Sequence, residues 1–307
     1  MVRLIRPRAI AWLAVAAGLA SSMSAEGPAA RPRVMKAGYV VIAADFHVHS
    51  FPGDGGLPPW ELAVEARRRH LDAIALTNHN STHSWRLSQW LFPGAGRAAG
   101  VLLLPGDELT GVGYHLAVIG VTAPIPWHQP AASAAAAVHA AGGVAIAAHP
   151  IADPVKETWP FLDDAALTAL DGVEVAHPLI HAKDQWRRQL LAFYERAKGI
   201  HPTIAAIGST DFHHFAPLGL GRTYLFVREA TQAGVLDAIR AGRTVACDGR
   251  GESYGPSELV AMIGEDCRRD AALPPAGDTA LDRFSTWLVW LGLVTLVVVG
   301  ADEAGLK

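Results

Sequence analysis

A series of short apolar segments, each followed by a histidine or an acid, is the feature that most constrains the fold of this chain. The first segment spans residues 39–44 and is followed by DFHVHS at residues 45–50. A short apolar run predicts a buried strand, and residues two apart on a strand point to the same face. We therefore expect His47 and His49 to lie side by side, as half of a metal site.

The apolar segments recur along the middle of the chain and alternate with helical patterns. The further expected strands are residues 71–77, 101–105, 114–121, 144–148, 172–176, 203–208 and 223–227. Strands that are apolar throughout and alternate with helices favour an α/β fold with a parallel sheet covered on both faces. Most of the polar endings lie on the carboxyl side of these strands, where barrels of this class place their active sites.

Nine side chains at or near these strand ends are candidate metal ligands. They are His47, His49, Asp54, His79, Glu108, His115, His149, Asp211 and His213. Nine ligands are too many for one ion, and a carboxylate such as Glu108 can bridge two, so the set would serve two or three divalent ions. Imidazole and carboxylate without thiolate suit zinc, manganese or iron. The expected chemistry is hydrolysis by a metal-activated hydroxide.

The charge of the chain limits its partners. The net charge of the 307 residues is −3, with no long basic run, which disfavours binding of a nucleic-acid duplex through a basic patch. A small anionic substrate held by metal ions remains compatible with this charge. Cys247 and Cys267 are the only cysteines, and they can pair if the chain is exported. Sequence alone leaves this pairing and the oligomeric state open.

The termini differ in composition from the middle of the chain. Residues 1–25 have a basic start, an apolar middle and a small-residue end, which predicts a secretory signal peptide or an uncleaved membrane anchor. Residues 26–38 are expected to be a linker, residues 39–250 the catalytic domain, and residues 251–284 a linker or extension.

Residues 285–301 are uncharged and are expected to form a C-terminal membrane helix. A core helix or an interface helix is the alternative. Together with the N-terminal segment, this pattern predicts an exported, extracytoplasmic protein. It would lie in the periplasm or at the cell surface, anchored to the membrane through its termini.

Five segments, in order, resemble the motifs of the PHP family, which is named for polymerase and histidinol phosphatase domains. They are DFHVHS at 45–50, LTNHN at 76–80, PGDELT at 105–110, AAHP at 147–150 and GSTDFH at 208–213. The resemblance implies a distorted (β/α)7 barrel with a di- or trinuclear metal centre. In this centre the first ion would be held by His47, His49, Glu108 and Asp211. Glu108 would bridge to a second ion, held also by His115 and His149. The third ion would be held by His79, His213 and Asp54.

The chain departs from the family pattern at one position, and two of its segments resemble one branch of the family. The second motif of the family usually has an aspartate where this chain has Asn78, which puts a charged partner beside the ligand in doubt. FPGDG at 51–55 and NHNST at 78–82 resemble an exported, single-domain branch of the family that is similar to carbamate-ester metallohydrolases.

The leading hypothesis is a metal-dependent phosphoesterase acting on a small phosphate ester such as a nucleotide. Glu108 and Asp211 are expected to be catalytic through the metals, and His177 as an acid or substrate contact. Arg222 and Arg187 are expected to bind the phosphate.

Two alternatives stay open. One is a carboxylic or carbamic ester hydrolase with the same metals, its apolar pocket lined by Trp60, Trp85, Trp90 and Trp159. The other is a membrane-tethered metal-binding protein without turnover.

Overall fold

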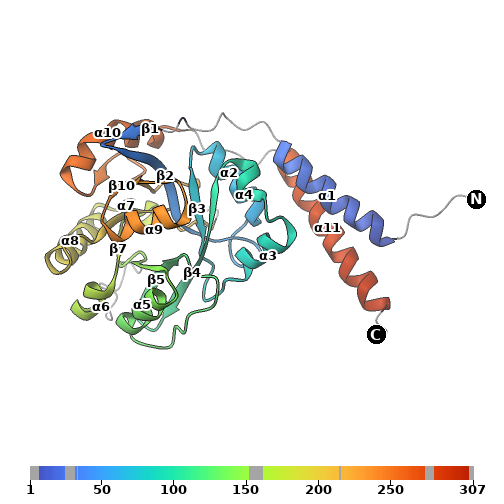
Figure 1. The fold of residues 1–307 in the computed structure, drawn as a ribbon, viewed down its shortest axis with the longest axis horizontal. Coiled ribbons are helices and arrows are strands. Elements are labelled where there is room, and N and C mark those ends of the chain that lie inside the picture. Colours follow the sequence, from blue (N-terminus) through green and yellow to red (C-terminus); the bar gives the residue numbers. More distant parts are fainter. Residues whose placement is uncertain are drawn as a thin grey trace, which may run out of the picture. The chain divides into compact units, whose positions relative to one another are not determined.

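The structure is a computed structural model that describes residues 7–24, 32, 34–151, 162–213, 216–273 and 280–303 (Figure 1). The chain divides into two compact units. One combines Met1–Pro28 with Ala276–Lys307, and the other is Ala29–Pro275. The larger unit contains every candidate metal ligand.

The larger unit is built on one mixed sheet, whose hydrogen-bonded order is β11-β10-β9-β2-β3-β4-β5-β6-β7-β8, with β1 paired to β2 outside this order. Its strands are β1 (Val34–Lys36), β2 (Tyr39–Val48), β3 (Ala73–Leu76), β4 (Leu102–Gly111), β5 (Tyr114–Ile119), β6 (Val144–Ala147), β7 (Gly172–Ala176), β8 (Ala205–Gly208), β9 (Arg222–Val227), β10 (Thr244–Cys247) and β11 (Ser253–Tyr254). The sheet curves until β8 approaches β9, where the amide of Gly208 donates to Oγ1 of Thr223. The result is a nearly closed barrel, and the predicted α/β class is confirmed.

The direction of the strands differs from the expected parallel sheet. The pairs β2–β3, β3–β4, β6–β7 and β7–β8 are parallel. β5 is antiparallel to both of its neighbours, and β9 is antiparallel to β2 and β10. For β5 the reason is local, because only two residues separate it from the end of β4 at Gly111, and so short a turn joins antiparallel strands alone. The prediction of a wholly parallel sheet is therefore wrong.

Helices pack against the sheet (Figure 1). They are α2 (Pro59–Arg68), α3 (His83–Leu91), α4 (Ala95–Ala99), α5 (Ala131–Ala140), α6 (Asp164–Ala169), α7 (Pro178–His181), α8 (Asp184–Ile200), α9 (Gln232–Arg240) and α10 (Ser257–Ala271). Two of them begin at polar caps: the side chain of Asp163 accepts from the amide of Ala166, and that of Thr231 accepts from the amide of Gly234. Such caps satisfy amides that have no partner within the helix.

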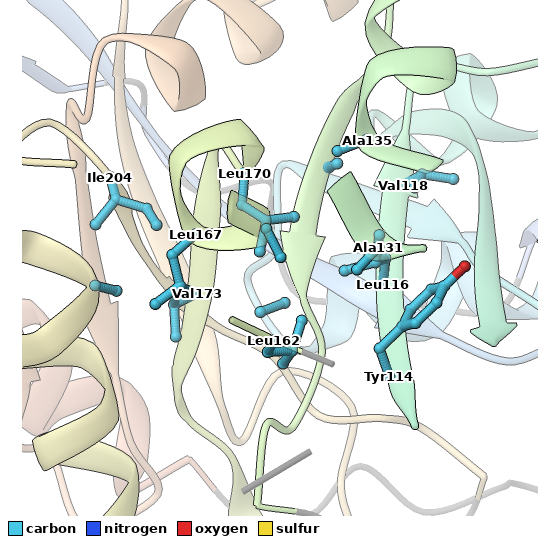
Figure 2. Packing of buried hydrophobic residues seen from close by; sticks show 14 of the residues in the cluster. Tyr114, Leu116, Val118, Ala131, Ala135, Leu162, Leu167, Leu170, Val173 and Ile204 are labelled. Atoms are coloured by element: carbon cyan, nitrogen blue, oxygen red, sulfur yellow. The ribbon is translucent and has the colours of Figure 1, made fainter. Parts of the chain in front are cut away.

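Alternate residues of the strands pack into two separate apolar clusters. Leu116 and Val118 of β5 lie in one cluster with side chains of α5, α6 and α8 (Figure 2). Ala117 and Ile119 of the same strand lie in the other cluster, together with side chains of α9. Because both faces of the strand are buried from Leu116 onward, the sequence from Leu116 to Ile119 is wholly apolar.

Residues 251–284, expected to be a linker or extension, contain β11 and α10, which belong to the larger unit. A disulfide joins Cys247 of β10 to Cys267 of α10, and both side chains are buried. This pairing, which the sequence left open, fastens α10 to the edge of the sheet. Disulfides are typical of proteins in oxidising compartments.

The smaller unit is a pair of helices, α1 (Pro7–Ser24) and α11 (Ala280–Glu303). The two helices touch at glycines. A Cβ atom at Gly18 would lie 2.7 Å from Cγ2 of Val289, and one at Gly292 would lie 2.7 Å from a carbonyl oxygen of α1. The helices run antiparallel, since the later part of α1 meets the earlier part of α11. Glycine is needed at both positions because the backbones approach closely there.

These helices include the segments expected to reach a membrane. α1 covers much of residues 1–25, of which 1–6 and 25 lie outside the described residues, and α11 includes 285–301. Among the described residues, no helix is both long enough and apolar enough to cross a bilayer. The predicted membrane helix is therefore not supported, and export of the chain stays a prediction. Most of the expected linker, 26–31 and 33, also lies outside the described residues.

Replacing both cysteines by serine should destabilise the larger unit. The disulfide closes a loop with a sequence separation of 20 residues, and in the chain-entropy model a loop of that length contributes about 3 kcal/mol. Denaturant unfolding of wild-type and Cys247→Ser/Cys267→Ser protein measures the difference. Reductant should lower the stability of the wild type to that of the variant and leave the variant unchanged. Equal stability of the two oxidised proteins would contradict the prediction.

Candidate metal centre

The nine candidate ligands come from different strands and meet at one end of the barrel. His47 lies on β2, His49 and Asp54 follow β2, His79 follows β3, Glu108 lies on β4, His115 lies on β5, His149 follows β6, and Asp211 and His213 follow β8. The carboxyl ends of β2, β3, β4, β6 and β8 thus contribute to one site, as expected for an α/β barrel. β5 runs the opposite way, so it contributes through its beginning.

The most buried group of these ligands consists of His47, His49, Glu108 and Asp211. Nε2 of His47 lies 3.3 Å from Oε2 of Glu108 and 3.2 Å from Oδ1 of Asp211. Nε2 of His49 lies 3.2 Å and 3.1 Å from the same two oxygens. All four atoms are buried, and none has a hydrogen-bond partner within the described residues.

These separations fit a coordinated ion. Bonds of about 2.0–2.2 Å from a metal to imidazole nitrogen and carboxylate oxygen place tetrahedral ligands about 3.3–3.6 Å apart, close to the separations seen here. Buried polar atoms are normally hydrogen-bonded, so four that converge without partners require an explanation. A divalent cation between them satisfies all four at once, and the donor set of two imidazoles and two carboxylates therefore fits such an ion.

A second group of ligands shares Glu108 with the first. It consists of His79, Glu108 and His115. Nδ1 of His115 lies 2.7 Å from Oε1 of Glu108, and Nδ1 of His79 lies 2.7 Å from Oε2. The two oxygens of one buried carboxylate thus face different histidines, which is the arrangement of a bridging ligand.

A third group surrounds Asp54 and consists of His49, Asp54, His79 and His213. Oδ1 of Asp54 lies 3.0 Å from Nδ1 of His49, and Oδ2 lies 3.2 Å from Nε2 of His79 and 3.1 Å from Nε2 of His213. Asp54 is 44% exposed, so this group opens to solvent whereas the first is closed.

The grouping differs in two respects from the one that the family resemblance implies. His79 accompanies Glu108 and His115 in the second group, where His149 was expected, and His49 joins the third group. Nε2 of His149 nevertheless lies 3.1 Å from Oε1 of Glu108, so His149 remains within reach of the same carboxylate.

The charges of these groups stabilise one another. Burial raises the pKa of Glu108, but the charge of His47 and contacts with His115 and His149 lower it well below its usual range. Burial lowers the pKa of His49, but contacts with Asp211, Asp54 and Glu108 raise it to about 10. Protonated imidazoles thus supply the positive charge that the buried acids require. A divalent ion supplies the same charge, and its binding displaces those protons.

Two ligands sit in an uncommon backbone conformation. The φ angle is 26° at His149 and 52° at Asp211, in the left-handed region that side-chain-bearing residues seldom adopt. Both residues lie shortly after the end of a strand, His149 after β6 and Asp211 after β8. Left-handed residues cluster at functional sites, where the surrounding structure holds them in place.

Two buried acids that sequence reasoning did not single out support the ligands. Asp45 accepts hydrogen bonds from the amides of Thr210 and Gly219, both at 3.0 Å, and so holds the loop that carries Asp211. Glu174 lies in the middle of β7, and its Oε1 lies 2.9 Å from Nδ1 of His47. For Glu174, the one signal in the sequence that could have indicated this role is its place inside an otherwise apolar strand.

Asn78, which departs from the family motif, holds the loop after β2. Its Oδ1 accepts from the amide and the hydroxyl of Ser50, at 3.2 and 2.9 Å, and its Nδ2 donates to the carbonyl oxygen of Ser50 at 2.7 Å. An aspartate has no N–H group for the last of these bonds. The asparagine therefore suits the contacts that this loop makes.

His177 borders the first group without belonging to it. Its side chain is buried, and its Nε2 lies 3.6 Å from Oδ2 of Asp211. The His177 ring stands edge-on to that of His149, with 5.7 Å between the centroids. Neither ring nitrogen of His177 has a hydrogen-bond partner among the described residues.

The two arginines expected to bind a phosphate are engaged elsewhere. Arg222 is buried, and its Nη1 donates to Oδ2 of Asp270 at 2.9 Å. Arg187 donates to Glu252 at 2.6 Å. Neither belongs to a ligand group, so the expected role of both as phosphate contacts is not supported. The sequence around an isolated arginine does not distinguish a substrate contact from a structural ion pair.

Comparison with known proteins supports the fold. No protein-family model and no curated protein matches the sequence. Among solved structures, the chain is similar to a two-domain protein from Bacteroides vulgatus that contains a predicted PHP-like metal-dependent phosphoesterase. The TM-score is 0.61 and the identity 22%, over 79% of this chain and 75% of that chain. At this identity, the similarity shows a shared fold.

Two weaker matches were also found. One is a lesion-specific endonuclease from Pyrococcus furiosus, with TM-score 0.47, 14% identity and coverage of 68% of this chain and 59% of that chain. The other is a provisionally assigned metal-dependent phosphoesterase from Bifidobacterium adolescentis, with TM-score 0.45, 20% identity and coverage of 57% and 90%. Similarities this weak do not establish a shared fold.

Removing Glu108 should cost the protein more than one ion, because this carboxylate belongs to two ligand groups. We expect Glu108→Gln to lose the ions of both groups and His115→Ala to lose only the ion of the second. Metal content per chain after loading and dialysis measures this. His139→Ala, which changes a histidine outside all three groups, is the control and should match the wild type. A Glu108→Gln variant with the metal content of the wild type would refute the assignment.

Proposed function

We propose that this protein is a metal-dependent hydrolase that cleaves a small phosphate ester. The observation that carries the proposal is the buried convergence of Nε2 of His47 and His49 with one oxygen each of Glu108 and Asp211. Glu108 belongs to two of the ligand groups and its carboxylate can bridge two ions, which supports a centre of two or three divalent ions. The fold shared with the Bacteroides vulgatus protein, which contains a predicted PHP-like metal-dependent phosphoesterase, agrees with this function.

The ligand side chains would fix the positions of the metal ions, and the ions would activate the substrate and water. Divalent ions held by these groups would supply Lewis acidity towards a phosphoryl oxygen and would acidify water. Because thiolate ligands are absent from the groups, zinc, manganese or iron is suitable. Glu108 directs Oε2 towards the first group and Oε1 towards His115, so it is the residue that would hold two ions. Asp211 directs Oδ1 towards the first group and Oδ2 towards His177.

We assign to His177 the role of proton donor to the leaving group. A proton donor must border the ions without binding them, and the position of His177 beside Asp211 meets both conditions. Neither ring nitrogen has a hydrogen-bond partner among the described residues, so no other side chain holds the proton that the ring would donate to a substrate. General acid catalysis of this kind contributes about 10²–10⁴-fold to a rate.

A phosphate ester is favoured over a carboxylic or carbamic ester because its several oxygens can contact several ions at once. The arginines do not strengthen this preference, since Arg222 and Arg187 are paired with acids. The tryptophans do not strengthen the alternative. Trp60 is wholly buried in α2, Trp90 is exposed, and Trp159 lies outside the described residues. A measurement of turnover is therefore needed to distinguish phosphate esters from carboxylic or carbamic esters as substrates.

Turnover by the metal-loaded full-length protein tests the proposal. We would strip the protein with a chelator, reload it with manganese, zinc or iron(II), and offer p-nitrophenyl phosphate, bis(p-nitrophenyl) phosphate and p-nitrophenyl acetate. We expect hydrolysis of a phosphate substrate, and its loss in Glu108→Gln but not in His139→Ala. Turnover of the acetate alone would indicate the carboxylic or carbamic ester alternative. Bound metal without any turnover would indicate the non-catalytic alternative.

The role of His177 predicts a dependence on the leaving group. Nitrophenolate leaves without a proton, whereas an alkoxide does not. His177→Ala should therefore slow hydrolysis of an alkyl phosphate by about 10²–10⁴-fold and that of p-nitrophenyl phosphate much less. Metal content should be unchanged, because His177 is outside the ligand groups. An equal loss for both substrates would contradict a proton-donating role.

A further inference from the structure

Glu174 is a fully buried acid on β7 whose two oxygens contact the ends of three other strands. Its Oε1 lies 2.9 Å from Nδ1 of His47 and accepts a hydrogen bond from the hydroxyl of Ser209 at 2.5 Å. Its Oε2 accepts from the amide of His149 at 2.6 Å. These contacts reach β2, the segment after β8 and the segment after β6. Because both oxygens are engaged, Glu174 is not itself available as a ligand.

The contact with His47 determines which nitrogen of the ring faces the site. A carboxylate accepts a hydrogen bond, so Nδ1 of His47 carries the proton opposite Oε1 of Glu174. The lone pair of the neutral ring then lies on Nε2, the atom that converges with Glu108 and Asp211. An imidazole binds a metal only through a nitrogen that carries no proton. The hydrogen bond thus selects the tautomer that can bind.

The contact with the amide of His149 acts on the backbone. His149 adopts the left-handed conformation that places its Nε2 3.1 Å from Oε1 of Glu108. A conformation of this kind persists only where the surrounding structure holds it. The hydrogen bond to Oε2 of Glu174, with that carboxylate 0% exposed, holds the amide in place.

We propose that Glu174 is a positioning residue of the metal centre, which sets the tautomer and orientation of His47 and the backbone of His149. The inference rests on the proposed metal centre and adds a residue to it. Carboxylates that accept from the second nitrogen of a metal-binding histidine orient the ring and increase its basicity, and their loss typically lowers metal affinity 10–100-fold.

Asp171 provides a matched control in the same part of the chain. It directly precedes β7, and its Oδ2 lies 2.8 Å from Nε2 of His139 and accepts from the amide of Ala145 at 2.8 Å. It therefore makes the same two kinds of contact as Glu174, with a histidine ring and a backbone amide. His139 belongs to no ligand group, so Asp171 has a structural role without a link to the metals.

The experiment compares Glu174→Gln with Asp171→Asn in the full-length protein. A glutamine has one acceptor oxygen, so it can serve either Nδ1 of His47 or the amide of His149, and its NH2 group faces the other donor. We would measure zinc affinity by competition with a chelator, the absorption spectrum of the cobalt(II)-loaded protein, and thermal unfolding of the metal-free protein.

We expect Glu174→Gln to weaken zinc binding about 10–100-fold and to change the cobalt spectrum. Asp171→Asn should leave both unchanged, even where it lowers the unfolding temperature. Glu174→Gln protein with the affinity and spectrum of the wild type would overturn the inference. Equal losses of affinity in the two variants would do the same, since they would indicate a general loss of stability.

Two further outcomes separate this inference from the proposed function. If the wild type binds neither zinc nor cobalt, the metal centre itself is refuted. If Glu174→Gln does not fold, Glu174→Asp takes its place, because the aspartate keeps the charge but its shorter side chain withdraws the oxygens from His47. We expect weaker zinc binding in Glu174→Asp also, and wild-type affinity there would overturn the inference.

Discussion

A buried carboxylate surrounded by imidazole rings is the interaction on which this end of the barrel depends. Glu108 is 0% exposed, and ring nitrogens of His79 and His115 each lie 2.7 Å from one of its oxygens. A buried charge is costly unless opposite charge and hydrogen bonds compensate for it. The charge of His47 contributes to that compensation here, and a divalent cation would contribute in the same way. The packing of the strand ends and the affinity for metal therefore have the same electrostatic origin.

The barrel places these groups in two layers. The outer layer consists of side chains at strand ends, which converge because the strands that carry them are neighbours in one curved sheet. The inner layer consists of acids such as Asp45 and Glu174, whose hydrogen bonds hold the amides and rings of the outer layer. Ligands that are fixed in this way need little movement when an ion binds, which is the preorganisation that the proposed hydrolytic function requires.

Much of this arrangement followed from the sequence, since His47 and His49 after an apolar run predict two rings on one face of a buried strand. The antiparallel direction of β5 was missed because apolar patterning does not depend on strand direction. Glu174 was missed because it stands alone in its strand, without a spacing pattern. The ion pair of Arg222 with Asp270 was missed because Asp270 lies far away in the sequence and comes close only in the fold.

The position of a bound ion tests the central claim most directly. A crystal of the full-length protein soaked with zinc and measured at the zinc absorption edge would locate that ion by its anomalous scattering. The account predicts a peak about 2.0–2.2 Å from Nε2 of His47, Nε2 of His49 and a carboxylate oxygen of each of Glu108 and Asp211. Zinc bound only at other residues, or an intact cluster without any peak in a soaked crystal, would contradict it.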